Sequence, residues 1–173
     1  MKSPDPDAIK WGDWQRLTPF EQLMVDDAAG LNSFAVSALF FFHGDSPVTL
    51  EWARTQFAPR LLAHPRFRAR LQVERSGRAS FVALPTPLDL TDLVVEEQPQ
   101  AMLPSVEGPS RAAVCASDLA ARDEAFYKRI DTLVTAPLPR DRPLWVMHLL
   151  PGYVPDAPGH QGTALLLRVH HVI

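Results

Sequence analysis

Proline is the residue that most limits what this chain can fold into. The 173 residues include 17 prolines, distributed along most of the sequence. Each proline lacks a backbone N–H donor and has a fixed φ, so it ends or kinks a helix and is excluded from central strands. The chain therefore has to be built from short helices and strands. A bundle of long helices is excluded.

The composition is that of an ordinary globular protein, with 46% apolar residues, 21% charged residues and a net charge of −3. It has no basic surplus of the kind that nucleic-acid binding requires, so we expect no nucleic-acid partner. The single cysteine, Cys115, excludes an internal disulfide and fits a reducing compartment. No signal-peptide pattern and no apolar run of about 18 residues is present. These features predict a cytoplasmic location.

The N-terminal segment predicts a flexible leader followed by a short helix. Residues 1–16 are polar and rich in Pro and Asp. Thr18, Pro19 and Glu21 then follow the capping-box pattern, with proline at the first helical position. We predict a helix that runs from Pro19 to Asp27.

Helices and strands mix along the rest of the chain. The segment 33–42 is apolar and rich in aromatic residues, which predicts a strand covered on both faces. Helices are predicted over 49–64, with a kink near Pro59, and over 116–137. Further strands are predicted over 67–73, 81–85, 143–153 and 163–173, with an irregular connection over 85–116 that contains one short strand. This mixture indicates an α/β or α+β fold with a central sheet.

Six arginines gather in one stretch of the chain, and they have two interpretations. They are Arg60, Arg66, Arg68, Arg70, Arg75 and Arg78. They either attract the phosphates of a bound molecule or form the solvated face of a strand, and the second interpretation needs no ligand.

Two adjacent histidines, His170 and His171, follow an apolar run in the segment LLLRVHHVI. Neighbours on a regular strand point to opposite faces, so His171 is expected on the side of Val169 and His170 on the side of Arg168. The pair then cannot chelate one metal ion together, and we predict no metal site. The histidines are either structural residues without a chemical role or, on an apolar face, a candidate general base, because desolvation favours a neutral imidazole.

The region from APLPRDRPLW to LLLRVHH resembles the wax ester synthase/diacylglycerol acyltransferase family. This family belongs to the acyl-CoA-dependent acyltransferases of the chloramphenicol-acetyltransferase-like fold, whose signature is HHxxxDG. The segments LTPFEQLMVDD and LLAHPRFRARLQ also resemble family segments in the same order. The likeness spans roughly residues 14–173. Two departures are Pro139, where the family usually has Asp, and Val146, where an acidic residue often follows the Trp.

The resemblance implies a fold and a domain organisation. It assigns residues 17–173 to the N-terminal domain of a two-domain α/β (α+β) fold, with a mixed central sheet and flanking helices. The Asp and Gly of the signature are expected beyond Ile173, so the resemblance implies an incomplete domain without its C-terminal partner.

The resemblance also implies a reaction. His171 is expected to be the general base that deprotonates a fatty alcohol or diacylglycerol, with acyl-CoA as co-substrate and no other cofactor. His170 is expected to pack or hydrogen-bond beside it. Pro143, Leu144 and Trp145 are expected on the neighbouring strand, where they line or support the acyl channel. Trp145 has a second interpretation as an ordinary core residue.

Two alternatives to this function stay open. Condensation domains of peptide synthesis share the HHxxxDG signature and the fold, although RPLW and HPRFRARL favour the lipid enzyme. The second alternative is that the chain is no enzyme by itself, but an inactive N-terminal half that has to pair with a C-terminal portion or a second chain. The water-insoluble substrates imply peripheral association with a membrane or lipid-droplet surface.

Overall fold

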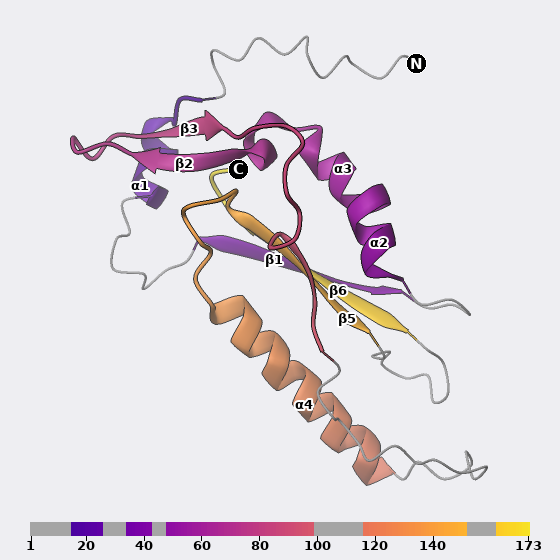
Figure 1. Cartoon of the computed structure of the whole chain (residues 1–173). Helices are drawn as coiled ribbons and strands as arrows, with labels where there is room; N and C mark the ends of the chain where they lie inside the picture. Colours follow the sequence, from indigo (N-terminus) through magenta and orange to yellow (C-terminus); the bar gives the residue numbers. More distant parts are fainter. Residues whose placement is uncertain (1–14, 26–33, 43–47, 99–115, 152–161) are drawn as a thin grey trace, which may run out of the picture.

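The computed structural model describes residues 15–25, 34–42, 48–98, 116–151 and 162–173 (Figure 1). Its centre is a mixed four-stranded sheet with the strand order β1-β6-β5-β4. The strands are β1 (Ala35–Phe42), β4 (Val94–Glu96), β5 (Trp145–Pro151) and β6 (Thr163–His170). Strand β6 is antiparallel to both β1 and β5, and β4 is parallel to β5. The predicted α/β fold with a mixed central sheet is confirmed.

A hairpin of β2 (Ala69–Val73) and β3 (Ala79–Ala83) forms a second, two-stranded sheet. The predicted hairpin is confirmed, but a 3₁₀ turn over Pro65–Arg68 replaces the first residues of its predicted first strand. Gly77 has a φ of 83°, a conformation that suits glycine in the tight turn between the strands. Gln15 and Arg16, which belong to the predicted leader, lie beside β3: the Gln15 carbonyl accepts a hydrogen bond from the Phe81 N–H at 2.9 Å.

The first helix, α1 (Pro19–Val25), has the predicted capping box. The Glu21 N–H donates to Thr18 Oγ1 at 3.2 Å, and the Thr18 N–H donates to Glu21 Oε2 at 2.7 Å. Two backbone donors at the start of the helix are thereby satisfied by side chains. The last two residues of the predicted helix, Asp26 and Asp27, lie outside the described residues.

The second predicted helix consists of three pieces. Helix α2 (Leu50–Trp52) leads into a π-helical turn (Ala53–Phe57) and then into α3 (Ala58–Leu62). The irregular turn precedes Pro59, the second residue of α3, which has no N–H to donate to the preceding helical turn. The disturbance predicted near Pro59 is present, but it lies on the N-terminal side of the proline.

Helices cover both faces of the central sheet (Figure 1). The segment α2–α3 packs on one face, where Ala53 and Ala58 join Trp145 and Leu165 in a buried cluster. Helix α4 (Ala116–Thr135) packs on the other face through Phe126 and Leu133. Among the described residues, no helix combines the length and apolar character needed to cross a bilayer.

The burial predicted for the first strand is wrong. Strand β1 forms over the predicted segment, but it is the last strand of its sheet and pairs with β6 alone among the described residues. Its side chains Val36 and Phe40 are 55% and 39% exposed. An edge strand has a neighbour on one side only, so its apolar residues are covered less completely than those of a central strand.

Candidate active site

The two histidines lie where the central strand β6 ends. Strand β6 stops at His170, and His171 begins a turn, so the regular strand predicted through residue 173 ends earlier than expected. The His170 N–H donates to the Leu144 carbonyl at 2.9 Å, and the His171 N–H donates to the Phe34 carbonyl at 2.7 Å. The residues that directly precede β1 and β5 therefore hold the backbone of the pair. The side chain of His171 is exposed.

His170 is half-buried and belongs to the same side of β6 as Arg168. Its Nδ1 accepts a hydrogen bond from the Val172 N–H at 3.4 Å. Burial lowers the pKa of His170 below its ordinary value, and the positive charge of Arg140 and the neighbouring His171 lower it further. A neutral imidazole that accepts a hydrogen bond at Nδ1 carries its proton on Nε2. His170 therefore accepts a hydrogen bond within the turn that contains His171.

The residue after the pair is anchored by an arginine. Val172 is fully buried, and Arg66 donates a hydrogen bond from Nη1 to the Val172 carbonyl at 2.6 Å. Arg66 also forms an ion pair with Glu21, and its guanidinium lies 4.9 Å from the centre of the Phe81 ring. The sequence placed Arg66 on a solvated strand face or at a phosphate site. The solvated strand face is wrong for Arg66, because the residue lies in the 3₁₀ turn Pro65–Arg68 and its side chain is half-buried against α1, β3 and the histidine turn.

Trp145 lies on the strand next to the histidines, as predicted. It pairs with Val169 in the register between β5 and β6. Its side chain is 1% exposed, and its Nε1 donates to the Phe67 carbonyl at 2.9 Å. Pro143 and Leu144 directly precede β5 and are also buried. All three residues are therefore buried, and Leu144 and Trp145 lie next to the end of β6.

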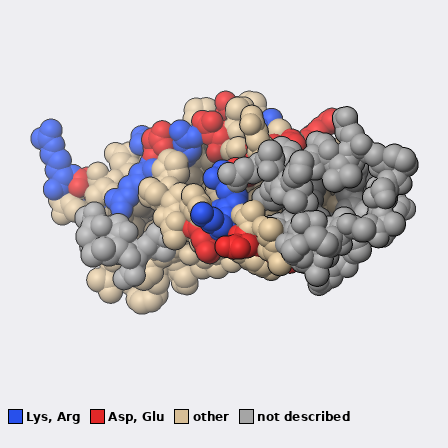
Figure 2. Space-filling model, turned by 90° about the horizontal axis from the view of Figure 1, so that it is seen from below, with Lys and Arg blue, Asp and Glu red and all other residues tan. Residues whose placement is uncertain are grey.

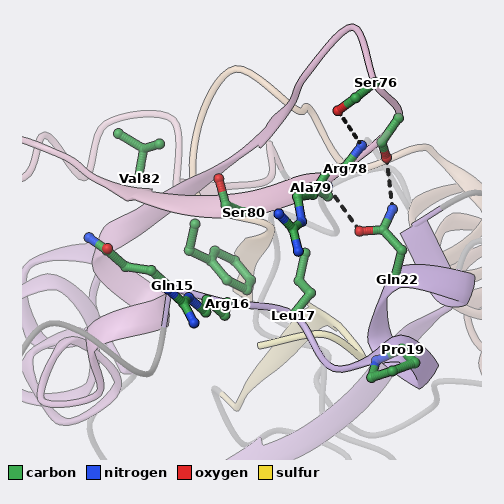
Figure 3. Close-up of a pocket in the computed structure, with 12 residues that line it drawn as sticks. Gln15, Arg16, Leu17, Pro19, Gln22, Ser76, Arg78, Ala79, Ser80 and Val82 are labelled. Carbon is green, nitrogen blue, oxygen red and sulfur yellow. Dashed lines mark hydrogen bonds between the residues drawn. The ribbon is translucent and has the colours of Figure 1, made fainter.

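Two hollows lie near the β2–β3 hairpin. The larger, with a volume of about 1370 Å³, is an open groove between α1 and β3 that includes Arg16, Gln22 and Arg78 (Figure 3). Gln22 closes one side of it, since its Nε2 donates to the Gly77 carbonyl and its Oε1 accepts from the Ala79 N–H, both at 2.9 Å. Neither histidine of the pair lines this groove. A smaller hollow of about 370 Å³ lies closer to the histidine turn and is lined by His64, Pro65, Arg66, Phe67 and Ile173.

A second group of charged residues, which the sequence did not indicate, lies between the sheet and α4. Glu97 forms an ion pair with Arg129, and its Oε1 is 2.8 Å from Nδ1 of His148. Burial lowers the pKa of His148 below its ordinary value, and the charges of Arg168 and Arg129 act in the same direction, against the opposing effect of Glu97. On the face of the molecule seen in Figure 2, Lys and Arg side chains lie next to Asp and Glu side chains.

Comparisons with known proteins give a fold but no family. No protein-family model and no curated protein sequence matches the chain. Among solved structures, the chain is similar to the wax ester synthase/diacylglycerol acyltransferase from Marinobacter aquaeolei VT8. The identity is 23% and the TM-score is 0.57, over 91% of this chain and 34% of that chain. A condensation domain that mediates chain release from the enacyloxin polyketide synthase matches at 19% identity and a TM-score of 0.49, over 82% of this chain and 23% of that chain.

The first of these matches agrees with the architecture described above. The mixed sheet with flanking helices matches the fold of that acyltransferase. The chain spans about a third of the length of the matched synthase. The described part of the chain therefore has the fold of part of that synthase.

Proposed function

We propose that this chain carries the catalytic histidine of a long-chain O-acyltransferase, which moves an acyl group from acyl-CoA to a fatty alcohol or diacylglycerol. The placement of His171 is the main support for this proposal. It lies directly after the interior strand β6, its N–H donates to the Phe34 carbonyl, the N–H of the preceding His170 donates to the Leu144 carbonyl, and its imidazole is exposed. A general base needs this combination of a fixed backbone and an accessible ring.

In the proposed reaction, His171 takes the proton from the acceptor hydroxyl as its oxygen attacks the thioester carbonyl carbon. The tetrahedral intermediate then collapses, the C–S bond breaks, and the departing CoA thiolate receives the proton from the His171 imidazolium. The products are an ester and free CoA. Since a thioester is already activated, the transfer needs no covalent enzyme intermediate. General-base catalysis contributes about 10²–10⁴-fold to such a step.

The fold and the sequence support the proposal independently of each other. The fold is shared with part of a wax ester synthase/diacylglycerol acyltransferase. The sequence resembles that family in the RPLW segment and in the adjacent histidines. Strand pairing brings these two segments together, because Trp145 lies opposite Val169 in the register.

We assign the activity to this chain acting with a further portion. The matched synthase is about three times as long as the part that this chain covers. That portion is either the continuation of the same polypeptide or a separate chain. On this proposal, the isolated residues 1–173 give no turnover, and turnover by them alone contradicts it.

The experiment compares acceptors and one variant in the complete protein. Palmitoyl-CoA is supplied with hexadecanol, with dipalmitoylglycerol or with an aminoacyl group on a carrier protein, and both CoA release and the new ester are measured. We expect ester formation with one of the two lipid acceptors and a loss of about 10²–10⁴-fold in His171→Ala, with an unchanged circular dichroism spectrum. Near-normal turnover of this variant rules out the base. Transfer to the carrier-bound substrate alone favours a condensation reaction.

A further inference from the structure

We propose that Arg66 is a positioning residue, which fixes the turn that presents His171. This inference rests on the proposed function, because it takes His171 as the base. The proposed role is exerted through the backbone carbonyl of Val172, which lies 106 positions from Arg66 in the sequence.

The guanidinium of Arg66 joins three segments of the chain. Its Nη1 donates to the Val172 carbonyl at 2.6 Å and to the carboxylate of Glu21. Its Nη2 donates to the Arg16 carbonyl at 3.3 Å. The plane of the group is further fixed by the Phe81 ring, 4.9 Å from its central carbon. A planar guanidinium with several donors can satisfy such a set of acceptors, whereas the ammonium of a lysine cannot match its geometry.

Glu21 makes this arrangement rigid. One carboxylate oxygen accepts from the Thr18 N–H at 2.7 Å, and the other accepts from Arg66. Burial raises the pKa of Glu21, but the hydrogen bonds from Arg66 and Thr18 outweigh this and hold the pKa below its ordinary value. The carboxylate therefore stays ionised near neutral pH. The capping box of α1 and the histidine turn are thus connected through one arginine.

The contact at Val172 acts on the backbone of His171. A carbonyl that is fixed one residue after the histidine limits the ψ angle of Val172 and the path of the turn. The His171 N–H is fixed at the same time by the Phe34 carbonyl, at 2.7 Å. The imidazole is exposed and gains little support from packing, so its position depends on these backbone contacts. A misplacement of about 1 Å in a catalytic group can lower the rate about 10²-fold.

The test uses three variants and two measurements. Arg66→Met removes the donors and keeps most of the length, Arg66→Lys keeps the charge, and Arg70→Met is the control on the neighbouring strand β2. The first measurement is kcat and KM of the complete protein with its best acceptor. The second is hydrogen exchange of the His171 amide, which needs no activity and can be made on the chain of 173 residues.

We expect Arg66→Met to lower kcat about 10²-fold with KM within about twofold, because the substrate contacts are retained and the base is misplaced. The His171 amide should exchange about tenfold faster than in the wild type. Arg66→Lys should recover part of both effects, and Arg70→Met should change neither.

Two results overturn the inference. One is a His171 amide that exchanges at the wild-type rate in Arg66→Met. The other is an equal loss of kcat in Arg66→Met and Arg70→Met, which indicates a general effect of lost charge. An inactive wild type with faster exchange in Arg66→Met contradicts the proposed function alone and leaves the positioning role supported.

Discussion

The two faces of the central sheet are built from the same two strands but differ in chemistry. On the side of α2–α3, strands β5 and β6 contribute Trp145, Met147, Leu149 and Leu165, each at most 1% exposed. On the side of α4, the alternate positions include His148 and Arg168 beside Leu150 and Leu166. One face is therefore an apolar core, whereas the other includes buried charges.

The difference shows how each face gains its stability. The apolar face needs only close packing, with one hydrogen bond for the Trp145 indole. The charged face has to supply partners for every ion that it buries. Arg168 is 2% exposed and donates to the carbonyls of Val134, at 3.1 Å, and of Ala136, both at the C-terminal end of α4. These carbonyls lie at the negative end of the helix dipole, where a cation is favourable.

The largest effect on stability is expected on the apolar face. Trp145→Ala removes a fully buried indole and leaves a cavity among Phe67, Met147 and Leu165, so the free energy of unfolding should fall by about 3–5 kcal/mol. Urea denaturation followed by circular dichroism measures it. Trp145→Phe keeps a ring but loses the hydrogen bond to the Phe67 carbonyl. The lost hydrogen bond should lower the free energy of unfolding by only about 1 kcal/mol, in addition to the effect of the smaller side chain. A loss below 1 kcal/mol for Trp145→Ala contradicts the account of this face.

A smaller effect is expected from the buried cation on the other face. Arg168→Met leaves the carbonyls of Val134 and Ala136 without their donor and should lower the free energy of unfolding by about 2 kcal/mol. Lys128→Met is the control, since this exposed cation lies on the same helix. An increase in the free energy of unfolding of Arg168→Met would also be informative. A more stable variant shows that burying the guanidinium, whose Nε has no hydrogen-bond partner among the described residues, costs more than its contacts return.

Local patterns predicted the fold better than the site. Thr18 and Glu21 of the capping box are three positions apart, and the apolar run of β6 lies within one strand, so a short stretch of sequence is enough to predict each of them. The exposure of Val36 depends on the order of strands in the sheet, which no local pattern specifies. The contact of Arg66 with Val172 joins residues 106 positions apart, and the contact of Glu97 with His148 joins residues 51 apart. Those side chains acquire their roles only when the sheet has formed.

The smallest effect is a pH dependence that belongs to the charged face alone. Burial holds the pKa of His148 below its ordinary 6.5, so the unfolded chain binds this proton more readily than the folded chain. Stability from His148 is therefore fully present above pH 6.5 and is lost as the pH falls toward the folded pKa. Protonation also places a second N–H, at Nε2, where the described residues offer no acceptor.

Unfolding of the wild type and of His148→Gln at about pH 7 and about pH 5 measures this dependence. The variant should lose less stability on acidification than the wild type, although a residual loss is expected because burial also lowers the pKa of His170. Glu97 adds nothing to this window. Burial raises the pKa of Glu97, but the hydrogen bonds from Arg129 and His148 lower it by more, so the net pKa lies below its ordinary 4.5. The stability that Glu97 contributes is therefore lost only below about pH 4.5. His64→Gln, which changes an exposed histidine, should follow the wild type. If the wild type and His148→Gln lose equal stability between the two pH values, His148 is not the source of the pH dependence, and the charged face does not differ from the apolar face in this respect.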